Sequence, residues 1–256
     1  KTRALFRPQP IRTLFIDDCI DRMTDFNAGG ARYNWIMPSF VGVANLVDSL
    51  YAVKIIVFDN KEMTLSELKA VLDSNFEGNE ALRQKILRLP KYGNDIDEVD
   101  MYGREVAYTY TKPVEKYENP RGGKYHAGLY PVSANVPLGY QTGATPDGRL
   151  AYTPIADGVG PASGRDVKGP TATANSVARL DHGIASNGTL FNQKFHPSAL
   201  SSMASLEKFV AYLRGYFDQK GMHVQYNVVS RETLLDAQAH PENYKNLVVR
   251  VAGYSA

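Results

Sequence analysis

Residues 248–256 read Val248-Val249-Arg250-Val251-Ala252-Gly253-Tyr254-Ser255-Ala256. The β-branched residues before the glycine favour an extended strand. Glycine can then adopt backbone angles that other residues avoid, so the stretch predicts a strand that enters a tight turn at Gly253. By itself, such a pattern is an ordinary structural feature.

Glycine at this position also has a chemical interpretation. A radical on its α-carbon is stabilised together by the donating amide nitrogen and the withdrawing carbonyl. A side chain would twist the two peptide units away from the planarity that this delocalisation requires, and glycine alone has a pro-chiral α-hydrogen that can be abstracted. The stretch therefore also fits a backbone radical at Gly253, held in a turn away from solvent.

Strand and helix signals alternate through the preceding segment. We expect a strand at 189–195, an amphipathic helix marked by Leu206, Phe209, Val210, Leu213 and Phe217 and ended by Gly221, a strand at 223–229, a short helix capped by Ser230, and a strand at 247–251. This alternation predicts an α/β architecture with parallel strand pairing.

The middle of the chain is rich in turn signals. Residues 112–124 predict a connecting loop, and residues 129–136 predict a strand with a bulge or an edge at Pro131. Residues 139–170 combine many glycines and prolines with few periodic apolar positions. A loop of that length within a compact domain is usually functional.

The first half of the chain reads mainly as helices. The first expected helix has Leu14, Phe15, Cys19, Ile20 and Met23 on one face and stops at Gly29-Gly30. A buried helix is expected within 40–58, and the capping box Thr64-Leu65-Ser66-Glu67 begins a helix that runs to about Ser74. Two further helices are expected at 79–89 and 97–109.

Composition excludes several classes of function. The formal net charge is +2, without long blocks of like charge, so nucleic-acid or membrane binding has no electrostatic basis. The most apolar stretch, 40–58, carries Asp48 and Lys54 and does not predict a membrane span. The single cysteine, Cys19, cannot form an internal disulfide, and we expect a buried structural thiol in a reducing, cytoplasmic setting. The five histidines are never spaced three or four apart, so no helical metal site is expected.

Segments along almost the whole chain resemble the glycyl radical enzymes of the pyruvate formate-lyase family, in family order. Besides Arg250-Val251-Ala252-Gly253-Tyr254-Ser255-Ala256, they are Gly29-Gly30-Ala31-Arg32-Tyr33-Asn34, Phe76-Glu77-Gly78, Pro90-Lys91-Tyr92-Gly93-Asn94-Asp95, Gly128-Leu129-Tyr130-Pro131-Val132, Pro146-Asp147-Gly148-Arg149, Gly169-Pro170-Thr171-Ala172 and Asn187-Gly188-Thr189-Leu190-Phe191-Asn192.

This resemblance implies a fold and a set of partners. The fold would be α/β, part of a ten-stranded α/β barrel with a C-terminal glycyl radical loop. Residues 1–125 would be a mainly helical part of the lyase (barrel) domain, and residues 126–256 would hold barrel strands, the long loop and the glycyl radical domain. No cofactor would be bound permanently, because a separate iron–sulfur activase would install the radical with S-adenosylmethionine. The partners would be this activase, a small-molecule substrate and a second copy in a homodimer, but no nucleic acid and no membrane.

The resemblance also implies roles for individual residues. Gly253 would carry the radical, and Arg250, Val251, Ala252, Tyr254 and Ser255 would support its loop. Tyr130 would line the substrate pocket, although a core aromatic is an equal reading, and His126 and Gly128 share its strand face at period two. Ala199 is a further pocket candidate, for which ordinary packing is the alternative.

The catalytic cysteine of the family stands in a Gly-Cys-x-Glu type of loop, which this sequence lacks. We therefore expect it in a part of the same polypeptide that precedes residue 1. Arg121-Gly122-Gly123-Lys124-Tyr125 resembles the glycerol and propanediol dehydratases, so the expected reaction is radical elimination from a small hydroxylated substrate. Formate C-acetyltransferase, decarboxylase and C–N or C–S lyase activities are the alternatives. A non-catalytic spare part that lends its glycyl radical is the alternative of another class.

Overall fold

The computed structural model of the chain describes residues 2–245, 247, 249–251 and 254–255. Its helices and strands are α1 (Thr2–Phe6), α2 (Pro10–Thr13), the 3₁₀ helix η1 (Phe26–Ala28), α3 (Val43–Val53), the π-helix η2 (Lys54–Asp59), α4 (Leu65–Asp73), α5 (Glu80–Arg88), α6 (Asp97–Val114), α7 (Asn135–Gly139), α8 (Pro170–Ala178), the 3₁₀ helix η3 (His182–Ile184), β1 (Asn192–Phe195), the 3₁₀ helix η4 (Pro197–Leu200), α9 (Met203–Asp218), β2 (Gln225–Val228), α10 (Arg231–Ala239), the 3₁₀ helix η5 (Pro241–Tyr244), β3 (Arg250–Val251) and β4 (Tyr254–Ser255).

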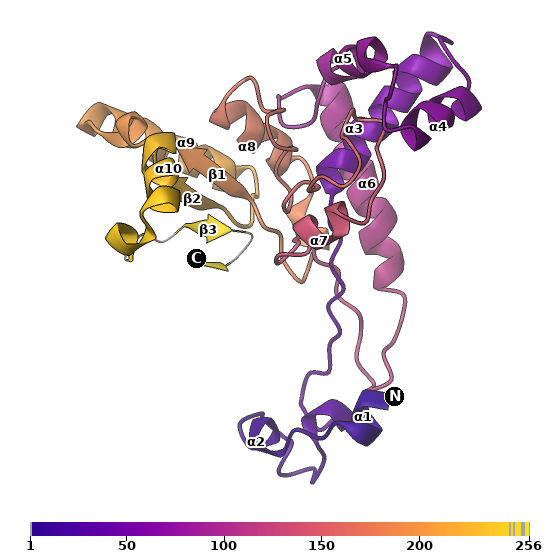
Figure 1. The fold of residues 1–256 in the computed structure, drawn as a ribbon. Coiled ribbons are helices and arrows are strands. Elements are labelled where there is room, and N and C mark those ends of the chain that lie inside the picture. The colour runs from indigo at the N-terminus through magenta and orange to yellow at the C-terminus, as the bar shows by residue number, and fades with distance from the viewer. Residues whose placement is uncertain (1, 246, 248, 252–253, 256) are drawn as a thin grey trace.

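The elements gather in three regions (Figure 1). Helices α3 to α6 form one region, and α8 to α10 with β1, β2 and β3 form a second. A small unit that contains α1 and α2 lies apart from both and is joined to them by extended segments of chain.

Four extended segments of the described residues pair in parallel, each with the next. Residue 36 bridges residue 125 and residue 39 bridges residue 128, both in parallel, and Leu129 bridges Thr189 in the same sense. Strand β1 then pairs with β2 in parallel, with Asn192 opposite Gln225. Helix α9 connects β1 to β2, so the predicted α/β architecture with parallel pairing is confirmed.

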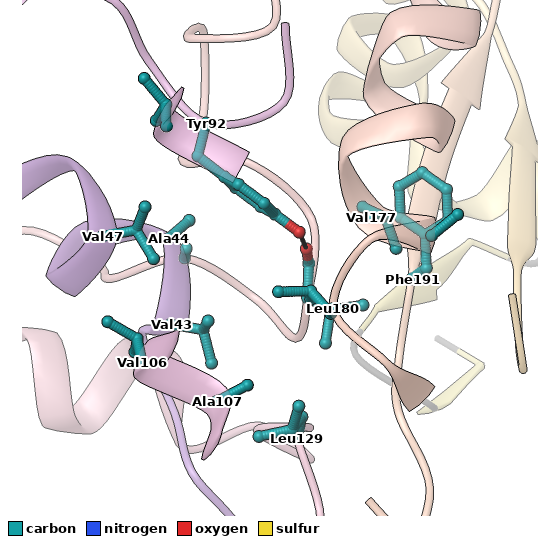
Figure 2. Close-up of a cluster of buried hydrophobic side chains, with 14 of the residues drawn as sticks. Val43, Ala44, Val47, Tyr92, Val106, Ala107, Leu129, Val177, Leu180 and Phe191 are labelled. Atoms are coloured by element: carbon teal, nitrogen blue, oxygen red, sulfur yellow. Dashed lines mark hydrogen bonds between the residues drawn. The ribbon is translucent and has the colours of Figure 1, made fainter. Parts of the chain in front are cut away.

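The main core joins the helical region to the parallel segments. Helices α3 and α6 pack against each other and against Leu129, while α8 contributes Val177 on the other side (Figure 2). Tyr92 is completely buried between these parts, and its hydroxyl donates to the backbone oxygen of Val159 at 2.9 Å. The core therefore fixes the long loop, to which Val159 belongs, against the helices.

Most helix signals of the sequence are confirmed. The Thr64 capping box is present at the start of α4, and the Ser230 hydroxyl accepts from the Thr233 backbone N–H at the start of α10. The buried helix expected within 40–58 is α3, continued by η2 to Asp59. No helix in the described part of the chain is long and apolar enough to span a bilayer.

The helix expected around residues 14–23 is wrong. Helix α2 ends at Thr13, and turns follow, because Asp18 and Met23 have φ angles of 71° and 47°, which an α-helix does not allow. Leu14, Phe15 and Met23 are exposed by 62%, 83% and 94%. Cys19 is buried as expected, at 1% exposure, but it lies in these turns rather than on a helix face.

The strand expected at 129–136 is also wrong beyond its first residues. Leu129 forms a strand bridge, but Pro131 has no N–H to continue the ladder, and Val132 turns the chain with a φ of 59°. Helix α7 then begins at Asn135. The loop expected at 112–124 starts slightly later than predicted, because α6 continues to Val114.

Gly221 is not the left-handed stop that the sequence suggests for α9. Helix α9 ends at Asp218, and Lys220 takes the positive φ, at 71°. Gly221 is needed for a different reason, because a Cβ at this position would overlap the Cζ, Cε1 and Cε2 atoms of the buried Tyr216 ring.

Alanine substitutions at Gly215, in the last turns of α9, and at Gly221, just after this helix, should have opposite effects on the stability of the protein. Gly221→Ala should destabilise the protein by about 1–3 kcal/mol, because the ring must move to make room for the methyl group. Gly215→Ala should stabilise it by up to about 1 kcal/mol, since Gly215 is helical and its Cβ would meet no atom within 4 Å. Thermal unfolding of the complete protein measures both, and equal midpoints for the two variants would contradict the close approach.

Candidate functional site

The segment 125–130 is the centre of the candidate site, because it carries the predicted pocket residues His126, Gly128 and Tyr130. Its backbone is hydrogen-bonded to neighbouring segments on both sides. The Gly128 N–H donates to the Pro38 oxygen at 3.0 Å, and the Gly128 oxygen accepts from the Phe40 N–H at 2.9 Å. On the opposite edge, the Leu129 N–H donates to the Gly188 oxygen at 2.9 Å. Segments far apart in the sequence therefore meet here in a fixed register.

The two faces of this segment differ in what they contact. Ala127 and Leu129 are fully buried, and Leu129 belongs to the main core. Successive side chains of a strand point to opposite faces. A Cβ on Gly128 would lie 2.6 Å from Cε1 of Tyr130, so Gly128 and Tyr130 share the face that points away from the core. His126 belongs to the same alternation.

Tyr130 is held by groups from two neighbouring segments. Its phenol oxygen accepts from the Asn187 side-chain Nδ2 at 2.6 Å. The Ser39 hydroxyl accepts from the Tyr130 backbone N–H at 3.0 Å and donates to the Tyr130 backbone oxygen. The ring is only partly buried. Tyr130 thus has a fixed backbone, a partnered hydroxyl and an accessible surface.

His126 lies beside a second polar group of the same neighbouring segment. Its Nδ1 is 2.8 Å from the Ser186 hydroxyl, and its ring is 4.3 Å from that of Trp35, centroid to centroid. Ser186 and Asn187 therefore reach His126 and Tyr130 in turn. Sequence reasoning missed both residues, although Asn187 opens one of the segments that resemble the family.

The proposed radical loop is described in part. Strands β3 and β4 pair antiparallel, with Arg250 opposite Ser255 and Val251 opposite Tyr254. Gly253 and Ala252, which stand between these strands in the sequence, lie outside the described residues. The paired residues that flank them nevertheless place the expected third strand in a hairpin rather than in the parallel set, and β3 lies against β2.

Ala199 is the remaining pocket candidate. It lies in η4, directly after β1, and its side chain is exposed. Its assignment to a pocket stays a prediction. Among the described residues, no group of three or more His, Cys, Asp or Glu side chains is arranged to hold a metal ion.

A polar hollow of about 720 Å³ lies between α3, the long loop and β1. Asn45, Asp147, Arg149 and Lys194 are among the residues that line it, whereas Tyr130 and His126 do not line it. Asn45 donates from Nδ2 to Asp147 at 2.7 Å and accepts at Oδ1 from a loop N–H. Arg149 donates to backbone oxygens of residues 142, 143, 150 and 153. These bonds brace the loop, which suits a structural role for the hollow.

Asp48 lies on α3 and is 1% exposed. One carboxyl oxygen accepts from the Tyr92 N–H at 2.8 Å, and the other has no hydrogen-bond partner among the described residues. Burial raises the pKa of Asp48 to about 7, against the backbone hydrogen bond and the nearby charge of Lys91, which lower it. Burial in turn lowers the pKa of Lys91. The carboxyl of Asp48 therefore changes charge near neutral pH.

The chain matches two protein families along consecutive parts of its length. Residues 2–139 match the pyruvate formate lyase-like family, and residues 155–256 match the glycine radical family. The chain therefore belongs to the pyruvate formate-lyase family of glycyl radical enzymes, which confirms the resemblance seen in the sequence.

Two similar proteins of known structure are concerned with dehydration. A structure concerned with 1,2-propanediol dehydration in Roseburia inulinivorans is 60% identical, with a TM-score of 0.94, over 99% of this chain and 33% of that chain. The glycerol-bound form of the B12-independent glycerol dehydratase from Clostridium butyricum is 54% identical, with a TM-score of 0.94, over 99% of this chain and 32% of that chain.

A curated relative is similar over the same span. The trans-4-hydroxy-L-proline dehydratase of Clostridioides difficile is 41% identical over 253 residues, which are 98% of this chain and 32% of the relative. The chain thus spans about a third of the length of the relatives that it matches.

The raised pKa of Asp48 predicts a specific pH dependence of stability. Its folded-state pKa of about 7 exceeds the ordinary value of 3.8, so its stabilising contribution is fully present below 3.8 and is lost as the pH rises through about 7. Asp48→Asn cannot ionise and can still accept from Tyr92. The variant should therefore gain stability relative to the parent between pH 5 and pH 8, as measured by denaturant unfolding of the complete protein.

The exposed Asp166 of the same loop offers a matched control, since Asp166→Asn should leave the pH slope of the parent unchanged. An identical slope in Asp48→Asn and the parent would show that Asp48 does not titrate in this range.

Proposed function

We propose that this chain is the C-terminal part of a glycyl radical enzyme that carries its radical on Gly253 and eliminates water from a small hydroxylated substrate. The observation that carries the proposal is the glycine radical match over residues 155–256, in a chain whose similar structures concern propanediol and glycerol dehydration. The hairpin pairing of Val251 with Tyr254 supports it, because it brings the residues on either side of positions 252 and 253 together.

The chemistry begins with removal of one α-hydrogen from Gly253. In the proposal, an iron–sulfur activase reduces S-adenosylmethionine by one electron, and the resulting carbon radical takes this hydrogen atom. The glycyl radical is delocalised over the adjoining amide and carbonyl, so it persists between turnovers. Arg250, Val251, Ala252, Tyr254 and Ser255 would hold the loop. No permanent cofactor is needed for this step, because the radical resides on the backbone.

The second step requires a cysteine that this chain does not supply. Cys19 is the only cysteine of the sequence, it is buried, and burial raises the pKa of its thiol. We propose that the catalytic cysteine lies elsewhere in the same polypeptide. It would return a hydrogen atom to Gly253 and become a thiyl radical, which leaves the glycine intact and places the unpaired electron beside the substrate.

The thiyl radical would then take hydrogen from the substrate carbon that bears a hydroxyl. A base from the cysteine loop would accept the proton of this hydroxyl, and the resulting ketyl radical would expel the neighbouring hydroxyl, which leaves as water with that proton. The product radical would recover hydrogen from the cysteine and regenerate the thiyl radical. Tyr130, with His126, Gly128 and Ala199, would form this chain's part of the pocket.

The remaining parts of the proposal concern architecture and partners. We propose that residues 1–125 belong to the lyase domain and that residues 126–256 hold barrel strands, the long loop and the glycyl radical domain. The parallel segments at 36–40, 125–129, 189–195 and 225–228 would then belong to a ten-stranded barrel completed by the rest of the polypeptide. The complete protein would form a homodimer and meet its activase in the cytoplasm.

Anaerobic assays of the activated complete protein test this function. The protein should convert glycerol or propane-1,2-diol into the corresponding aldehyde and water, and a panel with choline, trans-4-hydroxy-L-proline, an arylacetate, and pyruvate with coenzyme A defines its selectivity. Gly253→Ala should abolish turnover, because the methyl group replaces one of the two α-hydrogens and twists the adjoining peptide units away from the planarity that the delocalised radical requires, whereas Gly215→Ala should retain it.

Other outcomes of this panel would overturn the proposal. Coenzyme A-dependent cleavage of pyruvate without dehydration would establish formate C-acetyltransferase activity. Carbon dioxide release from the arylacetate, or C–N cleavage of choline, would establish the decarboxylase or lyase alternative.

A further inference from the structure

The hydrogen bond between Asn187 and Tyr130 has a defined direction. The Nδ2 group of an asparagine can only donate, so the phenol oxygen of Tyr130 is the acceptor at 2.6 Å. A tyrosine hydroxyl both accepts and donates. Because Asn187 occupies the accepting side, the proton of Tyr130 is left for another acceptor, and no side chain or backbone oxygen of the described residues takes it.

The surrounding chain holds both partners of this bond in place. The Asn187 backbone N–H donates to the Ala127 oxygen at 3.0 Å, so Asn187 is tied to the strand that carries Tyr130. Ser39 bonds both the N–H and the oxygen of the Tyr130 backbone. The pair is thus fixed from both edges of the segment 125–130.

Gly128 makes the close approach of the two side chains sterically possible. A Cβ at this position would lie 2.6 Å from the Tyr130 ring and 2.8 Å from Asn187 Nδ2. Both distances are too short for any side chain at this position. Because Gly128 has no side chain, Tyr130 and Asn187 can approach each other closely enough to form their hydrogen bond.

We propose that Asn187 is a positioning residue that fixes the hydrogen-bond polarity of Tyr130, so that the phenol donates to a hydroxyl oxygen of the substrate. This inference rests on the proposed dehydratase function and adds a selection rule to it. The pocket selects a substrate that presents an acceptor oxygen at this point, and a compound with a donor-only group there is excluded. Only a hydrogen bond is involved, and no proton leaves Tyr130.

Two substitutions of Asn187 separate the effect of hydrogen-bond polarity from that of side-chain shape. Asn187→Asp keeps the shape, but its carboxylate accepts the Tyr130 proton and thereby removes the donor from the substrate. Asn187→Ala loses the shape but leaves Tyr130 free to donate. Steady-state kinetics of the activated complete protein on propane-1,2-diol should show a loss of about 10- to 100-fold in kcat/KM for Asn187→Asp and a clearly smaller loss for Asn187→Ala.

The Tyr130→Phe background supplies the decisive comparison. Without the phenol, Asn187→Asp and Asn187→Ala should have equal kcat/KM, because no proton remains to be directed. The glycyl radical signal per protein should be the same in all these variants, which separates the pocket from the radical. Asn243→Asp, at an exposed site, controls for the added negative charge and should match the parent.

Two results would overturn the inference while leaving the dehydratase function intact. One is a larger loss for Asn187→Ala than for Asn187→Asp, which would show that shape rather than polarity matters. The other is an undiminished difference between these variants in the Tyr130→Phe background. If the parent does not dehydrate any diol, the proposed function itself fails, and this inference fails with it.

Discussion

The pairing of the segment 125–130 on both of its edges is the constraint on which the candidate site depends. One edge is bonded to residues 36–40 and the other to residues 187–190, so three parts of the chain separated by more than fifty residues share one register. A slip by one residue would move Tyr130 from the open face into the core and Leu129 out of it. Burial of Leu129 and Ala127 therefore protects the position of Tyr130.

The same constraint extends to the long loop through the core. Leu129 packs in a cluster with Val159, whose backbone oxygen accepts from Tyr92. Tyr92 in turn donates its N–H to Asp48, so one residue ties the loop to α3. Hydrogen bonds from Asn45 and Arg149 satisfy further polar groups of the loop. A segment almost without helices or strands is thus held by buried polar contacts and can cover the parallel segments in a defined shape.

The sequence predicted those features whose causes are local or are carried by a resemblance. The Thr64 capping box and the Ser230 cap follow from neighbouring residues, and the parallel pairing of β1 with β2 follows from the alternation of strands and helices; all three predictions were confirmed. The spacing of apolar residues around 14–23 predicted a helix that the structure does not have. This spacing shows which residues are apolar, but it does not show what they pack against. Backbone angles at Asp18 and Met23 decided the outcome instead.

The rest of the site could not be read from the sequence, because it arises from tertiary contacts. Asn187 meets Tyr130 across 57 residues, and only the pairing of their segments brings them together. The raised pKa of Asp48 depends on its burial in the tertiary fold, where its hydrogen-bond partner Tyr92 comes from 44 residues away. Gly221 looked like a helix stop, while the ring of Tyr216 is the reason for a glycine there.

The central claim is that Gly253 carries the radical, and electron paramagnetic resonance of the anaerobically activated complete protein tests it most directly. One α-hydrogen remains on a glycyl radical, so the spectrum should be a doublet, and this doublet should be absent from Gly253→Ala and present in Gly215→Ala. An unchanged doublet in Gly253→Ala would contradict the claim and place the radical on another residue.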